Sequence, residues 1–469
     1  MSSRSVAVFG ATVCALSSAC MVGPNYEKPK LPTPDTFRGA EQASAQPSIA
    51  DAQWFQVFED EQLQALIRTA LEQNDDLKLA ATRVLEAQAV LGITRADQYP
   101  SVSAGVDAGG GRTSEQGSTP ARTAAAMRLS VNAAWDLDFW GRFRRATESQ
   151  RAQLLSTEWG RRTVLSGIVS EVAQSYFALR ALDLQLDISK RTLTSRQESL
   201  QLTRVRESGG VTSLLDVREA EQLVFGASSA ITDLERRIVQ QENLISLLIG
   251  GFPSPVTRGH ELIDQPHAPD IPAGLPSSLL ERRPDIQAAE QQIVAANAQI
   301  GVARAAYFPS ISLTGGGGVQ SAALGALFSS GAGFWTAIVS ATQPVFTAGR
   351  TRSQVALAEA RTQEATIAYS QTIKTAFREA SDALVGYTKS REFRSQLESL
   401  TTAAQEARRL ADIRYQGGVT SYLEVLDADT RLFTAEITLA QARQAELSAF
   451  VEVYRALGGG WQQEGVPTR

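Results

Sequence analysis

Two acidic residues near the C-terminal end of the chain, Glu424 and Asp427, are three residues apart. If this segment is helical, that spacing puts both carboxylates on one face of the helix. A symmetric assembly of several copies would repeat them as acidic rings, and rings of Asp or Glu in a channel select for cations. The alternative is that they are ordinary acidic residues at a helix start, where the helix dipole favours negative charge. The residues alone leave both interpretations open.

The same arrangement occurs 208 residues earlier, where Asp216 and Glu219 take the corresponding places. Two basic residues, Arg206 and Arg414, each stand shortly before a Gly-Gly pair and the acids that follow it. Opposite charges this close along the chain are positioned to pair. We therefore predict that each arginine pairs with the acidic residues beyond its turn.

These matched residues belong to a longer internal repeat. Residues 209–217 (GGVTSLLDV) return as 417–425 (GGVTSYLEV), and 92–100 return as 301–309 at nearly the same offset. Similarity at one fixed period is typical of duplicated structural units. The sequence therefore predicts six segments. They are a signal peptide (1–19), a tether (20–50), a first repeat (51–249), a linker (250–284), a second repeat (285–457) and a C-terminal tail (458–469).

Each repeat has the same order of elements: a helix, two strands, a very long helix, a Gly-Gly turn and a last helix. The helices are predicted at 76–98, 142–208 and 211–249, and again at 285–307, 350–416 and 419–457. A helix of 67 residues is about 100 Å long at 1.5 Å per residue, more than one globular core can cover. The apolar spacing in the last helix resembles a coiled-coil seam. A plain coiled-coil rod is an open alternative.

The strands argue against a rod. They are predicted near 101–109, 127–139, 310–319 and 335–346, and residues 127–139 alternate between apolar and polar side chains. Such alternation with aromatic residues at the ends is typical of membrane β-strands, although a soluble half-buried sheet is the alternative. Four strands cannot close a barrel, and an open sheet edge is not stable in lipid. Three copies would supply 12 strands.

The N-terminus has the features of a secretory signal: Arg4, an apolar stretch, then small residues before Cys20. The segment resembles a bacterial lipobox, in which Cys20 becomes the acylated first residue of the mature protein. A plain signal with an incidental cysteine is the alternative. Residues 20–50, rich in Pro, Gln, Ser and Ala over most of their length, are predicted to form an extended tether.

Composition excludes several functional classes. The net charge is −5, so nothing attracts a nucleic-acid backbone. The chain has two Cys and two His, too few for most zinc sites or for His-dependent catalysis. We expect no enzyme activity, no metal and no cofactor other than a covalent lipid on Cys20. A periplasmic enzyme is a weaker alternative, because the many carboxylates show no pattern of a shared pocket.

Three motifs point to a known family. They are Leu279-Leu-Glu-Arg-Arg-Pro-Asp-Ile286, Phe346-Thr-Ala-Gly-Arg350, and Arg414-Tyr415 followed by Gly418 and Leu426-Asp427-Ala428. With them the mature chain resembles the outer-membrane factors of tripartite efflux pumps, the TolC and OprM type, especially the lipoprotein (NodT-like) branch.

The resemblance implies a mainly α fold with a small β part. Its long helices would form a trimeric periplasmic α-barrel, and its strands a 12-stranded β-barrel in the bacterial outer membrane. The homotrimer would be a passive exit duct for small toxic compounds such as drugs. Its partners would be a periplasmic adaptor (membrane fusion) protein, a proton-driven inner-membrane transporter and outer-membrane lipid. A coiled-coil structural or adhesive envelope lipoprotein is the alternative.

The resemblance also assigns roles at the Gly-Gly turns. Tyr415 and Leu423 match positions that constrict the closed aperture in the family. Thr420 stands where some members carry a basic residue that helps to latch it. The turns would be the tips on which the adaptor docks: Gly209, Gly210, Val211, Thr212 and Ser213 in the first repeat, and Gly417, Gly418, Val419, Thr420 and Ser421 in the second.

Overall fold

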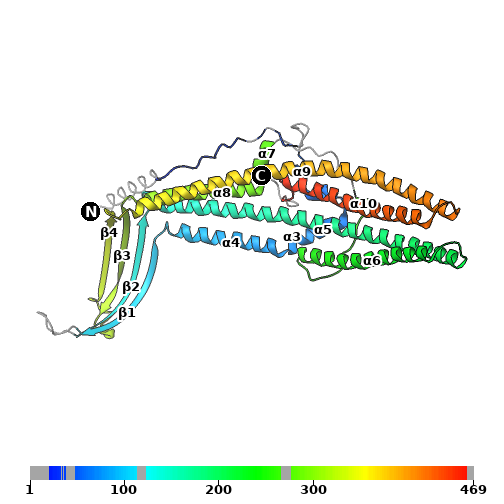
Figure 1. Cartoon of the computed structure of the whole chain (residues 1–469). Coiled ribbons are helices and arrows are strands. Elements are labelled where there is room, and N and C mark those ends of the chain that lie inside the picture. The colour runs from blue at the N-terminus through cyan, green and yellow to red at the C-terminus, as the bar shows by residue number, and fades with distance from the viewer. Residues whose placement is uncertain are drawn as a thin grey trace. The chain divides into compact units, whose positions relative to one another are not determined.

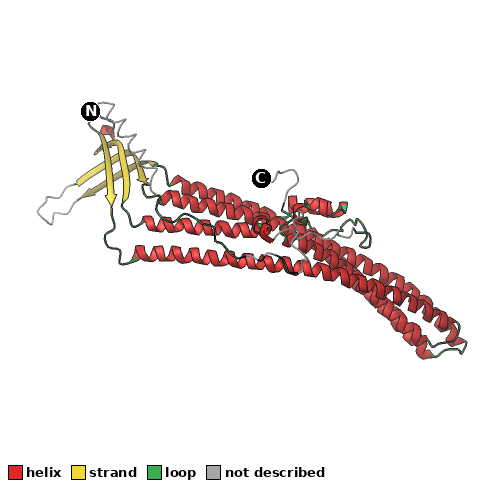
Figure 2. Cartoon of the chain, turned by 90° about the horizontal axis from the view of Figure 1, so that it is seen from above, coloured by secondary structure: helices red, strands yellow, loops and turns green. Residues whose placement is uncertain are grey.

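The computed structural model describes residues 21–32, 34, 36–38, 48–112, 123–265 and 276–461. The predicted signal peptide 1–19, the lipidation site Cys20, most of the second half of the tether and the end of the tail lie outside these residues. The described chain is mainly helical with one small sheet (Figure 1, Figure 2). None of the helices in this part of the chain is both long and apolar enough to cross a membrane.

The elements follow the order that the repeat predicts. The helices are α2 (Trp54–Val57), α3 (Glu61–Gln73), α4 (Asp75–Ala96), α5 (Arg142–Ser208), α6 (Leu214–Leu248), α7 (Pro276–Arg282), α8 (Pro284–Ala305), α9 (Arg350–Gln416) and α10 (Tyr422–Ala456), with short 3-10 helices η1 (Ile49–Asp51) and η2 (Leu324–Ala326). The strands are β1 (Ser101–Arg112), β2 (Thr123–Leu137), β3 (Ser310–Ser321) and β4 (Gly333–Thr342). The predicted bounds of α5 and α9 are confirmed.

The chain divides into two compact units, and each takes segments from both repeats. One contains the described parts of 1–30, 83–158 and 288–370, and the other those of 31–82, 159–287 and 371–469. The repeats in the sequence are therefore not the compact units of the fold. Elements from both copies pack together, because a single copy of this length buries too little apolar surface by itself.

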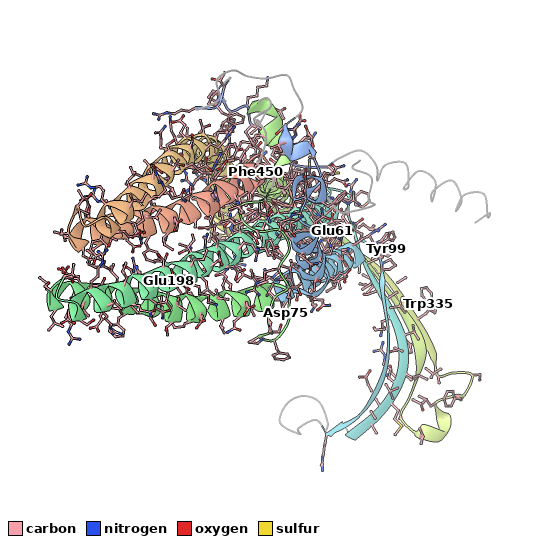
Figure 3. All side chains as sticks on the ribbon, turned by 90° about the vertical axis from the view of Figure 1, so that its right-hand side faces the viewer. Glu61, Asp75, Tyr99, Glu198, Trp335 and Phe450 are labelled. Atoms are coloured by element: carbon pink, nitrogen blue, oxygen red, sulfur yellow. The ribbon has the colours of Figure 1, made fainter. Side chains whose placement is uncertain are left out.

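The sheet lies in the first unit and is antiparallel in the order β1-β2-β3-β4. On β2 the apolar side chains at alternate positions Leu129 and Val131 are exposed. On β4 the exposed apolar side chains do not alternate, because the adjacent Ile338 and Val339 are both exposed, as is Trp335 (Figure 3). The glycines of β3 allow close packing, since a Cβ on Gly318 would lie 2.0 Å from the carbonyl oxygen of Leu129. Among the described residues, β1 and β4 are edge strands that pair on one side only.

All four strands end at residues other than those predicted: β1 and β3 continue to Arg112 and Ser321, past the predicted 109 and 319, whereas β2 and β4 stop short. β2 ends at Leu137, because the chain turns there and the amide of Phe139 donates to the Leu137 carbonyl at 3.0 Å. Phe139 is therefore not part of the alternating strand. β4 ends at Thr342, before Pro344 and well short of the predicted residue 346. Proline has no amide hydrogen with which to continue the ladder.

The predicted linker 250–284 is described over 250–265 and 276–284. It contains α7, and α8 begins at Pro284. Its earlier part is bound by Asp60, a buried carboxylate that accepts from the Tyr176 hydroxyl at 3.0 Å, the His260 amide at 2.9 Å and the Gln265 side chain at 2.8 Å. Burial by itself raises the pKa of Asp60, but these hydrogen bonds outweigh it and lower the pKa.

The second unit has an aromatic and aliphatic core. The ring of Phe58 makes edge contacts with those of Phe177, Phe450 and Tyr454, at centroid distances of 6.5, 6.4 and 6.1 Å. Such edge-to-face packing stabilises aromatic cores beyond the area that they bury. In this unit the helix hairpins α5–α6 and α9–α10 lie side by side, with their turns at the same end (Figure 1, Figure 2). That end holds all the predicted gate and tip residues.

Candidate functional site: the tips of the two helix hairpins

The two hairpin turns have the same backbone conformation. Gly210 has a φ of +71° and Gly418 a φ of +72°, a region that favours glycine. The amide of Val211 donates to the Arg206 carbonyl at 2.8 Å, and that of Val419 donates to the Arg414 carbonyl at 2.9 Å. This is the Schellman ending of a helix, and it explains why both Gly-Gly pairs end long helices. Val211 and Val419 are 76% and 72% exposed, so both tips present an apolar side chain to solvent.

A small apolar core joins the two hairpins behind the turns. It consists of Leu200, Val217, Ala220, Ala411, Tyr415, Tyr422 and Val425. The rings of Tyr415 and Tyr422 meet edge to face at 5.4 Å. Burial raises the pKa of Tyr422, whose hydroxyl accepts a hydrogen bond from that of Ser199 at 3.3 Å. The Tyr415 hydroxyl is buried and has no hydrogen-bond partner among the described residues.

The predicted aperture residues therefore have different environments. Tyr415 is only 5% exposed and packs within the protomer, whereas Leu423 is 60% exposed. A side chain that constricts an opening must reach it. Within this protomer, Leu423 has the exposure that such a role needs, and Tyr415 serves the packing between the hairpins.

The predicted pairing of Arg206 with the acids beyond its turn is wrong. Its guanidinium donates to the carbonyls of Tyr415 at 3.0 Å and Gln416 at 3.1 Å, and it lies 4.4 Å from the centre of the Tyr415 ring. These carbonyls are the free acceptors at the C-terminus of α9, where the helix dipole attracts a cation. Arg206 thus joins the first hairpin to the second.

The corresponding prediction for Arg414 is confirmed in its geometry. Its Nε lies 3.5 Å from Oε1 of Glu424, with both side chains partly exposed. The hydroxyl of Thr420 donates to the other oxygen of the same carboxylate. Thr420, the position without the family's basic residue, thus holds Glu424 by a hydrogen bond.

Asp427 and Asp216 complete the comparison of the acids. Asp427 is exposed and pairs with Arg431 at 2.9 Å, one turn further along α10. Asp216 forms a reciprocal capping box with Ser213 at the start of α6, with hydrogen bonds of 3.0 and 3.3 Å. For Asp216 the alternative interpretation, a helix-start acid, describes the observed contacts. Glu219 lies one turn further along α6 and is half-buried.

The sequence analysis missed a buried ion-pair network at Asp429, two residues beyond Asp427. Asp429 on α10 contacts Arg196 of α5 and Arg408 of α9, and residues 196 and 429 are 233 positions apart. The place of Asp429 in the repeat would have singled it out, because Glu221 stands 208 residues earlier and also binds two arginines. Hydrogen bonds from Arg204 and then Arg218 lower the pKa of Glu221.

An apolar groove of about 480 Å³ runs along the second hairpin, between α9 and α10. Its lining includes Leu397, Leu400, Ala404, Ala407 and Ala435. The small side chains leave room for another helix to approach closely. Among the described residues, no group of three or more His, Cys, Asp or Glu side chains is arranged to hold a metal ion.

The residues of the motif at 279–286 have a structural role. Leu279 and Ile286 are fully buried. Arg283 between them pairs with Asp285 and Glu379, at 2.7 and 2.8 Å, and donates to the carbonyl of Ala456 at 3.2 Å. This motif therefore anchors the start of the second repeat to α9 and the end of α10.

Comparison with known proteins identifies the family. The sequence model of the family described as outer membrane efflux protein matches residues 66–251 and 275–459, one segment in each repeat. The cation efflux system protein CusC of Escherichia coli O6:H1 is 37% identical over 95% of this chain and 97% of its own length. The probable efflux pump outer membrane protein TtgC of Pseudomonas putida KT2440 is 37% identical over 97% of this chain and 95% of its own.

Comparison with solved structures leads to the same family. The MtrE outer membrane channel of Neisseria gonorrhoeae, crystallised in its open state, superposes with a TM-score of 0.87 at 31% identity, over 96% of this chain and all of that one. The resemblance inferred from the sequence is thereby confirmed. So are the fold class, mainly α with a small β part as in trimeric outer-membrane channels, and the location in the bacterial outer membrane. The chain belongs to the outer membrane efflux protein family, whose members are passive exit channels of efflux systems and not enzymes.

Proposed function

We propose that the second hairpin carries the periplasmic gate of this efflux channel, with Glu424 and Asp427 as its charged residues and Leu423 as its apolar one. The observation that carries the proposal is the exposure of both carboxylates, 41% and 57% of the side chains, at the start of α10. In the first hairpin the corresponding Asp216 is bound in a capping box. Repeated around a symmetric axis, these exposed carboxylates would form an acidic constriction that favours cations.

The gate requires a homotrimer, and the sheet supports one. Every backbone amide and carbonyl in lipid needs a partner, so the free edges of β1 and β4 require neighbouring strands. Three copies of this four-stranded sheet would give a 12-stranded barrel. In this arrangement the repeats 51–249 and 285–457 each contribute two strands and one helix hairpin to every protomer.

The lipid anchor would be held at the base of the sheet. The amide of Val22, two residues after Cys20, donates to the carbonyl of Trp140 at 3.1 Å, between β2 and α5. The ring of Trp140 stacks on that of Phe308 at 4.6 Å. Aromatic side chains of this kind are enriched at membrane surfaces. We propose that the lipid is attached to Cys20, two residues before this hydrogen bond, and inserts into the outer membrane.

The partners are a periplasmic adaptor and an inner-membrane transporter, which we propose is proton-driven. Helical hairpins of the adaptor would dock on the exposed valines of the tips and in the apolar groove between α9 and α10, since small apolar side chains permit close helix packing. The cargo would be small toxic compounds, including drugs, with cationic ones favoured by the acidic gate. A passive duct needs no binding site for any one of them.

Replacing both gate acids tests the proposal. The double variant Glu424→Ala, Asp427→Ala, reconstituted as the full-length assembly in a planar bilayer, should show a severalfold higher conductance and lose its cation preference. Asp216→Ala with Glu219→Ala is the matched control from the first hairpin and should change neither. Unchanged conductance and selectivity in the first variant would refute the gate.

Docking has a separate test. Val211→Asp with Val419→Asp places charges on both tips without altering the turns. This variant should conduct normally in a bilayer but fail to restore resistance to toxic compounds in cells from which the gene is deleted. Full rescue of resistance would exclude the tips as the docking site.

A further inference from the structure

Asp429 is a buried carboxylate held by two arginines. Its side chain is 10% exposed; Oδ2 lies 2.8 Å from Nε of Arg196 and Oδ1 lies 3.2 Å from Nε of Arg408. The Arg196 side chain is itself 5% exposed. Charges removed from water in this way are stable only while they are paired, so losing either partner leaves an uncompensated charge.

The network connects all four helices of the tip region. Arg196 projects from α5, Arg408 from α9 and Asp429 from α10. Arg196 also donates to the carbonyl of Leu223 on α6 at 2.9 Å, and its guanidinium lies 5.0 Å from the centre of the Phe433 ring. One carboxylate therefore fixes α10 against both long helices, while the same arginine holds α6.

The position of Asp429 on α10 relates it to the gate. It follows Asp427 by two residues, which is about 200° around a helix of 3.6 residues per turn. The two carboxylates therefore lie on nearly opposite faces, and their exposures agree with this: 57% for the side chain of Asp427 and 10% for that of Asp429. The gate acids face outward from the short segment that Asp429 holds from behind.

The matching residue of the first hairpin lacks this connection. Glu221 binds Arg204 at 2.8 Å and Arg218 at 2.7 Å, so it too accepts from two arginines. Both of those arginine side chains are more than half exposed, and they come from α5 and α6 of the same hairpin. Through these ion pairs Glu221 joins the two helices of one hairpin, whereas Asp429 joins the second hairpin to the first.

We propose that Asp429 is the positioning residue of the periplasmic gate. This inference rests on the proposed gate. While Arg196 and Arg408 bind Asp429, the start of α10 is held against α5 and α9, and Glu424 and Asp427 keep their place at the constriction. Moving the second hairpin away from the first requires the carboxylate to leave Arg196 of α5, whereas Arg408, on α9 of the same hairpin, moves with it. A buried network that is either complete or broken gives the tip two states instead of a continuous range.

Bilayer recordings of the full-length assembly test this. Asp429→Asn should raise the single-channel conductance severalfold yet retain the cation preference measured from reversal potentials, because Glu424 and Asp427 are still present. A purely structural role would lower the yield of assembled channels without raising the conductance of those that form. Glu221→Gln is the matched control and should conduct like the parent protein.

The outcomes separate the two proposals. If the double variant of Glu424 and Asp427 conducts more but assembled Asp429→Asn conducts like the parent, the positioning role is refuted and the gate stands. If neither variant changes conductance, the gate itself is refuted, and the positioning role with it. Should Asp429→Asn not assemble, Arg196→Gln decides: it removes the ion pair between the hairpins but leaves Arg408 to neutralise Asp429, and it should raise conductance by a smaller factor, whereas parental conductance would overturn the proposal.

Discussion

The two hairpin tips have the same backbone and different side-chain contacts. The turns at Gly210 and Gly418 agree to within one degree in φ and close with equivalent hydrogen bonds. In the first tip, Asp216 caps its own helix and Arg206 reaches across to the carbonyl end of α9. The duplicated sequence thus preserves the conformation of the turn. The residues around the turn differ between the two copies, and so do their side-chain contacts.

The second tip differs from the first in its acidic side chains. Its acids are exposed, Arg414 pairs with Glu424 in partial contact with solvent, and two tyrosines fill the space between the hairpins. The polar groups of both tips make contacts within the protomer, but those of the first tip cap α6 and bind the end of α9, so the first tip acts as a support. The second tip leaves charge exposed where a neighbouring protomer or a cargo molecule can meet it.

The largest predicted difference concerns the apolar contact between the hairpins. Tyr422 is 3% exposed, whereas Leu214, its counterpart in the first repeat, is 57% exposed. Tyr422→Ala should lower the free energy of unfolding by about 3–5 kcal/mol, the usual cost of removing a buried aromatic ring. Leu214→Ala should cost about 0.5 kcal/mol or less, as at exposed sites. Denaturant unfolding followed by circular dichroism measures both, and equal losses would contradict the asymmetry.

The second-largest difference in the free energy of unfolding is expected between variants of Arg206 and Arg414. Arg206→Met removes two charged hydrogen bonds to the end of α9, and such bonds contribute about 1.5–3 kcal/mol each when they involve a charged group. Because part of the site is exposed, we expect a loss near the lower figure. Arg414→Met removes a partly exposed ion pair and should cost about 0–1 kcal/mol. The same unfolding assay applies, and a greater loss for Arg414→Met would reverse our assignment of support and gate.

Replacing the left-handed glycine should destabilise the two turns equally. A Cβ added at Gly210 or Gly418 meets no atom within 4 Å, so the cost of Gly210→Ala or Gly418→Ala comes only from the positive φ. That cost is about 1–2 kcal/mol. Thermal unfolding of the two single variants should therefore give matching shifts. A clear difference between them would show that the tips differ in their backbones as well as in their side chains.

The smallest effect concerns the helix caps. Ser213 accepts from the amide of Asp216 in the capping box, while Ser421 makes no such side-chain hydrogen bond. Ser213→Ala should cost about 1 kcal/mol. Ser421→Ala should be close to neutral in the same thermal unfolding measurement. If Ser421→Ala were the more damaging, the second tip would depend on a cap after all.

Much of the fold follows from local signals in the sequence. The bounds of α5 and α9 were predictable because long proline-free stretches end at Gly-Gly pairs, and a left-handed glycine is the usual end of a helix. The strand ends were less predictable. Phe139 continues the alternating pattern of β2 by residue type, but the chain has already turned at Leu137. Alternation reports which side a residue would face, not where pairing stops.

The candidate site was predictable only in part. The repeat and the spacing of acids located the tips and drew attention to Glu424 and Asp427. Nothing in the local sequence distinguishes Arg206, which binds carbonyls, from Arg414, which binds a carboxylate, because both stand at the same place before the same turn. Their partners depend on which helix end lies next to each guanidinium.

What the sequence determined by itself is the duplication, the order of the elements, the length of the two long helices α5 and α9, and the incompleteness of a four-stranded sheet. These depend on turn residues, periodicity and backbone pairing, which act over a few neighbouring positions. Only the tertiary structure decided which charges are buried together and which remain free. Arg196 and Asp429 are 233 residues apart. Whether two such residues form an ion pair depends on how four helices pack, since burial and distance set the strength of a charge interaction.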